Sequence, residues 1–291
     1  QSEKNGFIDM VGTEGEVIEQ IRALVSVLPA NNKDHDSYEV GADDLNRLCK
    51  GIESRVEDPA EMLAMLGDEY LFFETKRNYA KDMVTGFLKL NGMTVGTVAN
   101  RSAVYNEDGE KTDTYDGCLS ANGCQKAAEF VKFCDAFGIP VLTLTNVSGL
   151  HASMCSEQHL AKAMAMLTYA FTDATVPKVN VVTGKAYGSA YVTMNSKAVG
   201  ADLVYAWPDA EIGMMEADMA VKIMYTGADA EELARQAEAY RNLQSSPVSA
   251  AKRGYVDAII EPQSTRKYLI AAFEMLFTKK EIRPAKKHGT V

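Results

Sequence analysis

The chain has 291 residues, of which 46% are hydrophobic and 24% charged, the balance of a folded globular protein with a sizeable core. Its formal net charge of −10 works against non-specific binding to nucleic acid or to anionic membranes. No apolar run approaches the roughly 20 residues of a membrane span, and the five cysteines are odd in number and lack zinc-ribbon spacing. We therefore expect free thiols in a reducing cytoplasm, with no membrane span, no nucleic-acid partner and no metal site.

The amino-terminal part predicts two helices separated by a linker. Residues 16–28 carry apolar side chains at helical spacing as far as Pro29. Residues 30–44 are mostly polar and are typical of a linker or an exposed arm. Further along, Asp58 and Pro59 have the residue types preferred at the N-cap and the first position of a helix.

The rest of the chain predicts a hairpin followed by alternating helices and strands. Residues 86–100 favour two strands joined at Asn91-Gly92, and the acidic residues 106–117 favour a solvated loop. Helices are expected over 125–138, 156–174 and 189–200, and within 228–243 and 264–279; strands are expected over 139–147, 177–184, 201–208 and 210–215. A basic tail begins at Lys286. Apolar strands that alternate with helices indicate an α/β fold whose sheet is covered on both faces.

One connection, KAYGSA at residues 185–190, joins a buried strand to a helix through small side chains. The first amides of a helix lack a partner within the helix and carry the positive end of its dipole. Small residues at Gly188, Ser189 and Ala190 would let a ligand oxygen approach these amides, as in an oxyanion hole. Tight packing of the helix on the sheet explains the same residues, so the pattern alone leaves both interpretations open.

Two other groups of residues are candidates for chemistry. Ser189 with Lys185 or Lys197 would make a Ser-Lys nucleophilic pair, although serine at a helix start more often caps the helix. His151 and His159 lie near a second strand-to-helix connection, but their spacing is not that of a metal site.

Several segments resemble the biotin-dependent acyl-CoA carboxyltransferases. Residues 185–215, KAYGSAYVTMNSKAVGADLVYAWPDAEIGMM, are similar to that family's KAYGGAY…MxSK…GAD…AWPxAEIxVM. Residues 79–102, 126–149 and 250–276 are similar to the family's carboxy-terminal domain, in the same order. The resemblance covers most of the chain and is far more specific than a single glycine motif.

The resemblance implies a crotonase-like α/β fold, a spiral of strand-strand-helix units. Complete members have two such domains, and this sequence resembles a connector helix and linker over 1–45 followed by the carboxy-terminal domain over 46–291. The amino-terminal domain, which holds the acyl-CoA in this family, is not recognisable in the sequence. We therefore expect a chain that is inactive or weakly active by itself.

The resemblance also implies a reaction and a set of partners. In this family a carboxyl group moves between carboxybiotin on a carrier protein and an acyl-CoA. The backbone amides that correspond to Ser189 and Ala190 stabilise the ureido oxygen of biotin, and Gly188, Ser189, Ala190 and Tyr191 are the expected biotin-binding residues. The expected partners are the biotin carboxyl carrier protein, an acyl-CoA-binding amino-terminal domain or subunit, and further copies of the chain in a cytoplasmic oligomer.

Two departures from the family pattern bear on the site. Ser189 replaces the second glycine of KAYGGAY, which keeps the amide but adds a hydroxyl. Residues 145–153, TNVSGLHAS, replace VDTPGFLPG and lose its proline-glycine step, so the resemblance does not specify this wall of the site or the acyl substrate. The alternatives are a crotonase-like hydrolase or peptidase that uses a Ser189-Lys pair, and a non-catalytic assembly domain. The sequence does not distinguish a carboxylase from a decarboxylase.

Overall fold

The computed structural model describes residues 1–31, 43–106 and 108–283. The predicted linker over 30–44 lies mostly outside these residues, and the basic tail from Lys286 lies entirely outside them. Within the described residues no helix is long and apolar enough to cross a membrane. The described cysteines Cys49, Cys118, Cys124 and Cys134 are free thiols, as the sequence predicted.

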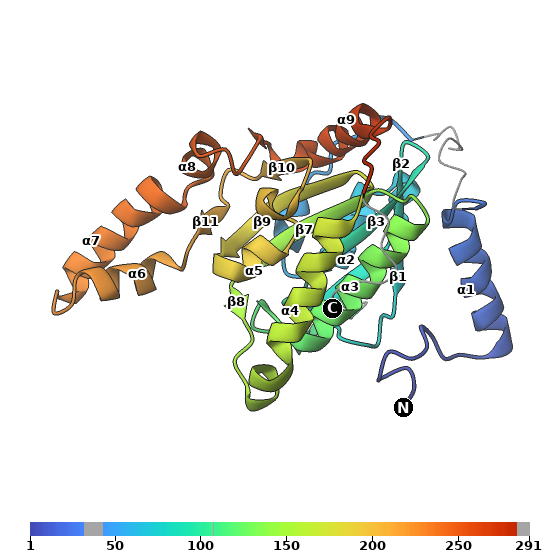
Figure 1. The fold of residues 1–291 in the computed structure, drawn as a ribbon, viewed down its shortest axis with the longest axis horizontal. Helices are drawn as coiled ribbons and strands as arrows, with labels where there is room; N and C mark the ends of the chain where they lie inside the picture. The colour runs from blue at the N-terminus through green and yellow to red at the C-terminus, as the bar shows by residue number, and fades with distance from the viewer. Residues whose placement is uncertain (32–42, 107, 284–291) are drawn as a thin grey trace.

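A mixed sheet of eight strands forms the centre of the molecule (Figure 1). Seven strands lie side by side in the order β1 (Phe73–Thr75), β2 (Met83–Leu90), β3 (Met93–Asn100), β7 (Val141–Val147), β9 (Lys178–Tyr187), β10 (Leu203–Ala206), β12 (Ala258–Ile259). The eighth, β11 (Glu211–Gly213), pairs with the carboxyl end of β9. The β1–β2–β3 pairs are antiparallel and all later pairs are parallel.

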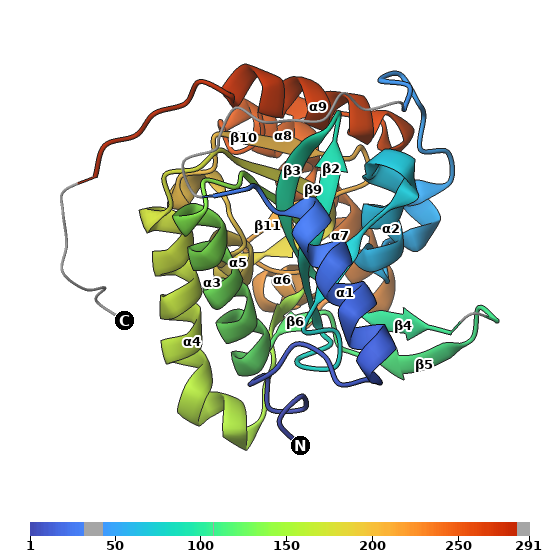
Figure 2. The ribbon, with the colours of Figure 1, turned by 90° about the vertical axis from the view of Figure 1, so that its right-hand side faces the viewer.

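Helices cover both faces of this sheet, which is why its strands are apolar on both sides. Helices α3 (Ala121–Ala136) and α4 (Met154–Asp173) cover one face, and α2 (Pro59–Leu66) and α9 (Thr265–Leu276) cover the other (Figure 2). Each face has its own hydrophobic core. Phe87 and Phe130 lie in the core beneath α3 and α4, and Trp207 and Phe273 lie in the core beneath α2 and α9.

Local signals in the sequence fix several of these elements as predicted. The side chain of Asp58 accepts a hydrogen bond from the amide of Ala60 and caps α2, with Pro59 at the first helical position. Asn91 and Gly92 both have positive φ angles, 50° and 78°, and turn β2 into β3. The hairpin and the α2 N-terminus are therefore confirmed.

Helix α1 (Glu14–Val27) lies alongside the body and buries none of its own residues fully (Figure 2). Leu24, Val27 and Leu28 pack against the core beneath α3 and α4, and the hydroxyl of Thr94 donates to the Val27 carbonyl at 2.6 Å. These contacts explain how α1 docks. The proposed boundary between connector and main domain at residue 45 stays a prediction.

A helical arm projects from the body beyond β11 (Figure 1). It consists of α6 (Ala217–Met224) and α7 (Ala230–Tyr240), which share a small core of their own, and the chain returns through a π-turn to α8 (Pro247–Lys252). The sequence predicted α7 but missed α6 and α8, which have only eight and six residues.

Two further predictions need correction. Residues 189–200 are not one helix but α5 (Gly188–Thr193) and a 3₁₀ turn (Lys197–Val199), separated at Asn195, whose φ is 52°. The polar stretch 106–117 is not all loop, since β5 (Lys111–Thr114) pairs with β4 (Ala103–Tyr105).

The remaining short elements complete the chain. They are β6 (Cys118–Leu119) paired with β8 (Gly149–Leu150), and 3₁₀ turns over Ile52–Arg55, Asp68–Tyr70 and Pro262–Ser264.

Candidate active site at the end of strand β9

Strand β9 passes into helix α5 with no intervening loop. Tyr187 ends the strand in an extended conformation, and Gly188 starts the helix with a φ of +57°. A Cβ atom at position 188 would lie 3.1 Å from the Met214 carbonyl oxygen, so both conformation and space favour glycine there. The amides of Ser189 and Ala190 belong to the first turn of α5, where no acceptor exists within the helix.

The predicted site residues face in different directions. Ser189 is exposed, whereas the Ala190 side chain is 1% exposed and lies in the core. Tyr191 is also buried, its hydroxyl has no hydrogen-bond partner among the described residues, and burial raises the pKa of Tyr191 to about 12. Ser189 is thus exposed at this connection while Ala190 and Tyr191 are buried, and the roles predicted for these residues stay predictions.

On one side, the end of β9 is held by two asparagines that the sequence did not single out. The Lys185 amide donates to Asn146 Oδ1 at 2.9 Å, and the Asn146 amide donates to Asn100 Oδ1 at 2.9 Å. The Asn100 side chain in turn donates to the Asn146 carbonyl. The β7–β9 pairing shifts register at this point, so side-chain amides take over where regular backbone pairing is interrupted. The available signal was an asparagine at the end of each of two otherwise apolar strands.

On the other side, the end of β9 is held by β11. Tyr187 donates its hydroxyl hydrogen to the Glu211 carboxylate. Burial and this hydrogen bond raise the pKa of Tyr187 well above its usual value, so the hydroxyl remains a donor. Arg241 lies 3.9 Å from Glu211 and forms an ion pair of 2.6 Å with Asp218 at the start of α6.

The lysines considered for a Ser-Lys pair have other partners. Lys185 Nζ lies 3.0 Å from Glu216 Oε1, and Lys197 Nζ lies 2.8 Å from Asp257 Oδ2. No hydrogen bond joins either lysine to Ser189 in the described part of the chain. The geometry therefore does not favour Ser189 as a nucleophile activated by a lysine.

The two histidines considered above have different surroundings. His151 Nδ1 lies 2.7 Å from Asp116 Oδ2, directly after β8, which packs beside α5. Burial raises the pKa of Asp116, but the hydrogen bonds from His151 and from the Cys118 amide outweigh it and lower that pKa overall. His159 is exposed on α4. Among the described residues, no group of His, Cys, Asp and Glu side chains is arranged to hold a metal ion.

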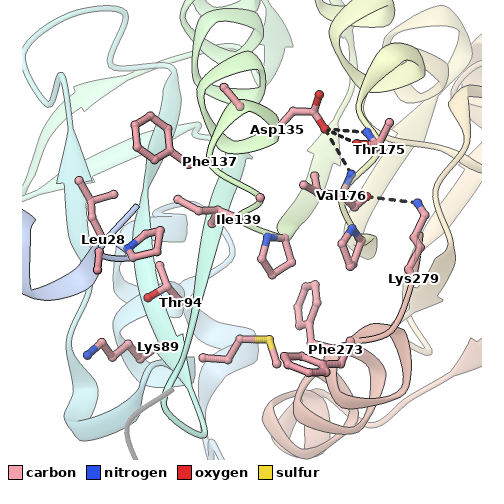
Figure 3. Close-up of a pocket in the computed structure, with 18 of the residues that line it drawn as sticks. Leu28, Lys89, Thr94, Asp135, Phe137, Ile139, Thr175, Val176, Phe273 and Lys279 are labelled. Atoms are coloured by element: carbon pink, nitrogen blue, oxygen red, sulfur yellow. Dashed lines mark hydrogen bonds between the residues drawn. The ribbon is translucent and has the colours of Figure 1, made fainter. Parts of the chain in front are cut away.

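A cavity of about 820 Å³ lies at the opposite end of the sheet (Figure 3). Its lining includes the segments that precede β7 and β9, whereas Gly188 follows β9. Two of its polar side chains are paired within the protein: Asp135 accepts from the backbone of Thr175 and Val176, and Lys279 donates to the Val176 carbonyl (Figure 3). In open α/β sheets ligands bind outside the carboxyl ends of the strands, which favours the Gly188 connection over this cavity.

The fold and the Gly188 connection define an α/β protein in which a central strand leads directly into the first turn of a helix at the carboxyl end of the sheet. The chain belongs to the family described as the carboxyl transferase domain, whose model matches residues 2–291. Its fold is the crotonase-like fold that the resemblance implied.

Three similar proteins place the chain within this family. It is 40% identical over 286 residues to the propionyl-CoA carboxylase beta chain of Roseobacter denitrificans, covering 95% of this chain and 54% of that protein. It is 38% identical to the methylmalonyl-CoA carboxyltransferase 12S subunit of Propionibacterium freudenreichii, covering 98% and 55%. The crystal structure of transcarboxylase 12S, described as a hexamer assembly with hydrolysed methylmalonyl-coenzyme A bound, superposes with a TM-score of 0.83 at 37% identity, covering 93% and 53%. The chain thus spans about half the length of the curated relatives it matches.

Proposed function

We propose that this chain is the biotin-side half of an acyl-CoA carboxyltransferase, moving a carboxyl group between carboxybiotin and an acyl-CoA. The family match and the names of the two relatives support this reaction class. The observation that carries the proposal is the backbone at Gly188, Ser189 and Ala190, which follows the family's KAYG sequence and starts a helix at the end of β9, where first-turn amides have no acceptor within the helix.

The residues at the connection fit the ureido group of biotin. Gly188 has no side chain, Ser189 is exposed, and Ala190 lies in the core, so the side chains of these three residues are small or point away from the connection. Bound biotin would supply the ring nitrogen that carries or accepts the carboxyl group. The Ser189 and Ala190 amides would donate to its ureido oxygen, where negative charge develops.

If backbone amides stabilise the developing charge, the reaction depends little on proton transfer by side chains of this chain. Amides that already point at the developing charge need no reorganisation during the reaction, and removing one such donor typically lowers the rate about 100- to 1,000-fold. The buried Tyr187 and the paired Lys185 would then shape the connection without transferring protons.

The partners follow from the same proposal. The coverage of 54% and 55% of its relatives fits one half of a two-domain unit. Following the resemblance, we assign residues 1–45 to a connector and 46–291 to the carboxy-terminal domain of that unit. An amino-terminal acyl-CoA-binding half, a biotin carboxyl carrier protein and further copies of the chain would complete the enzyme. The hexamer described for transcarboxylase 12S supports an oligomer.

A substitution that removes only one amide tests the proposal. Ser189→Pro eliminates a donor in the first helical turn, where proline is tolerated, and Ser189→Ala keeps it. With the amino-terminal half of a family member and a biotinylated carrier protein supplied, we expect Ser189→Pro to lower kcat for carboxyl transfer from methylmalonyl-CoA about 100-fold or more. Ser189→Ala should stay within about threefold of the unmodified chain, since it retains the donor.

Three outcomes would contradict the proposal. Equal rates for the two variants would exclude the Ser189 amide and favour an assembly role. Labelling of Ser189 by a fluorophosphonate probe would favour a hydrolase. Full activity of the isolated chain towards methylmalonyl-CoA with free biotin would show that no further half is needed.

A further inference from the structure

We infer that Tyr187 and Glu211 are positioning residues: their hydrogen bond fixes the end of β9 so that the Ser189 and Ala190 amides are held in place. The inference rests on the proposed function and assigns a role to two side chains outside the amides themselves.

The first step is the place of Tyr187 in the chain. It is the last residue of β9 and the N-cap of α5, so its backbone leads directly into Gly188. Its side chain is part of the protein interior, with the residue only 3% exposed. A buried ring fixed at its hydroxyl end restrains the backbone that carries it, and here that backbone sets the direction of the first turn of α5.

The second step is the partner strand. β11 has only three residues, and Gly213 pairs with Tyr187 across the parallel ladder. The hydroxyl of Tyr187 reaches back along this ladder to Glu211, the first residue of β11. The hydrogen bond between Tyr187 and Glu211 therefore adds a second link between β9 and β11.

The third step is the contact between β11 and the connection. The Met214 carbonyl, one residue after β11, lies so close to Gly188 that a Cβ there would approach it to 3.1 Å. A shift of β11 therefore acts directly on the residue whose positive φ starts α5. A fixed position of β11 therefore restrains Gly188 and the start of α5.

The fourth step is what holds Glu211. Arg241 lies 3.9 Å from its carboxylate and is itself paired with Asp218 at 2.6 Å. Glu211 is thus restrained from the side of the helical arm as well as by Tyr187. Since Tyr187 remains protonated, the pair acts through geometry and not through proton transfer.

The test compares Tyr187→Phe, Glu211→Ala and Glu211→Gln with Tyr105→Phe. Tyr105 is the matched control because its hydroxyl also donates to a glutamate, Glu57, but in the region of the distant β4–β5 hairpin. We expect Tyr187→Phe and Glu211→Ala to lower kcat about 3- to 10-fold, the effect of losing one hydrogen bond, with KM for the acyl-CoA unchanged. Glu211→Gln, which still accepts a hydrogen bond, should restore most of kcat.

A second measurement separates this inference from the proposed function. Two-dimensional amide NMR of the full 291-residue chain without ligand should show shifted Ser189 and Ala190 signals in Tyr187→Phe and not in Tyr105→Phe. The inference is overturned if Tyr187→Phe leaves both kcat and these signals unchanged while Ser189→Pro abolishes activity. It is also overturned if Glu211→Gln is as impaired as Glu211→Ala. If Tyr187→Phe shifts the Ser189 and Ala190 signals but Ser189→Pro is fully active, the proposed function is rejected and the positioning role of Tyr187 is retained.

Discussion

Gly188 combines two constraints that most glycines in the chain do not share. Its φ of +57° is costly for any residue with a Cβ, and a Cβ there would lie 3.1 Å from the Met214 carbonyl oxygen, closer than an ordinary van der Waals contact. Both constraints arise in the folded state, so substitution should lower the free energy of unfolding.

We expect Gly188→Ala to lower the free energy of unfolding by more than the roughly 1–2 kcal/mol that the left-handed conformation costs alone. Gly254→Ala is the matched control, because Gly254 has a φ of +81° and a Cβ added there would meet no atom within 4 Å. Urea unfolding of the two variants and the unmodified chain measures both losses. Equal losses would show that the Met214 carbonyl moves aside without cost.

Some features of individual residues could be predicted from the sequence, and others could not. The small residues at 188–190 were visible because a strand pattern precedes them and a glycine occurs where a turn is needed. The hydrogen bonds between Asn100 and Asn146 were not predictable from the sequence. The two residues lie 46 positions apart and meet only because β3 and β7 pair.

At the scale of elements, helix α3 is tied to the segment before β2 by a buried lysine. Lys126 is 1% exposed and its Nζ donates to the carbonyls of Lys76, Tyr79 and Met83 at 2.7–3.0 Å. This ammonium replaces the backbone donors that an irregular segment cannot supply for itself.

Lys126→Met keeps the length of the side chain and removes the charge and the donors. We expect it to lower the free energy of unfolding by about 1–3 kcal/mol, because buried carbonyls lose their partner. Lys132→Met, at an exposed position of the same helix, should change it by less than about 0.5 kcal/mol. Chemical denaturation measures both, and a Lys126→Met protein as stable as the control would contradict the bridging role.

Element prediction failed where distant partners decide the local conformation. Residues 189–200 have a helical pattern, yet the chain breaks at Asn195, whose buried side chain donates to Thr143 on β7 at 3.1 Å. A contact over 52 positions overrides the helical preference there. The start of the same segment was predictable because its signal is local.

At the scale of the whole molecule, a buried charge network joins helix α9 to residues 43–68, far apart from it in the chain. Arg266 on α9 is fully buried and pairs with Asp68 and, at 3.4 Å, with Asp43, which also pairs with Arg47 at 3.0 Å. Burial raises the pKa of Asp43, but its hydrogen bonds to Arg47 and the nearby guanidinium charges outweigh burial and lower the pKa overall.

This network should make stability depend on acid pH. A carboxyl group whose pKa is lower in the folded than in the unfolded state stabilises the fold above the unfolded value of about 3.9, and that contribution is lost as pH falls through the folded pKa. We expect Asp43→Asn to be less stable than the unmodified chain at about pH 6, with the difference shrinking below about pH 4.

Urea unfolding between these pH values measures the effect, with Glu53→Gln, an exposed carboxylate in the neighbouring 3₁₀ turn, as the control. A difference that stays constant with pH would exclude ionisation of Asp43 as its cause.

The sequence predicted the sheet covered on both faces, but not the order of its strands or the arm formed by α6 and α7. The alternation of apolar strands and helices indicates that both faces of the sheet are buried. The order of the strands depends on pairing between segments far apart in the chain. The arm has a small core of its own, and its position beyond β11 depends on packing between segments that the local pattern does not reveal.

The arm also makes this region sensitive to oxidants. Met214, Met219 and Met224 are 79%, 57% and 61% exposed, and conversion of a methionine to its sulfoxide turns an apolar side chain polar. Met214 is the residue whose carbonyl rests against Gly188. Peroxide in a stored preparation would therefore oxidise the residue that contacts Gly188 well before it reached the methionines enclosed in the core.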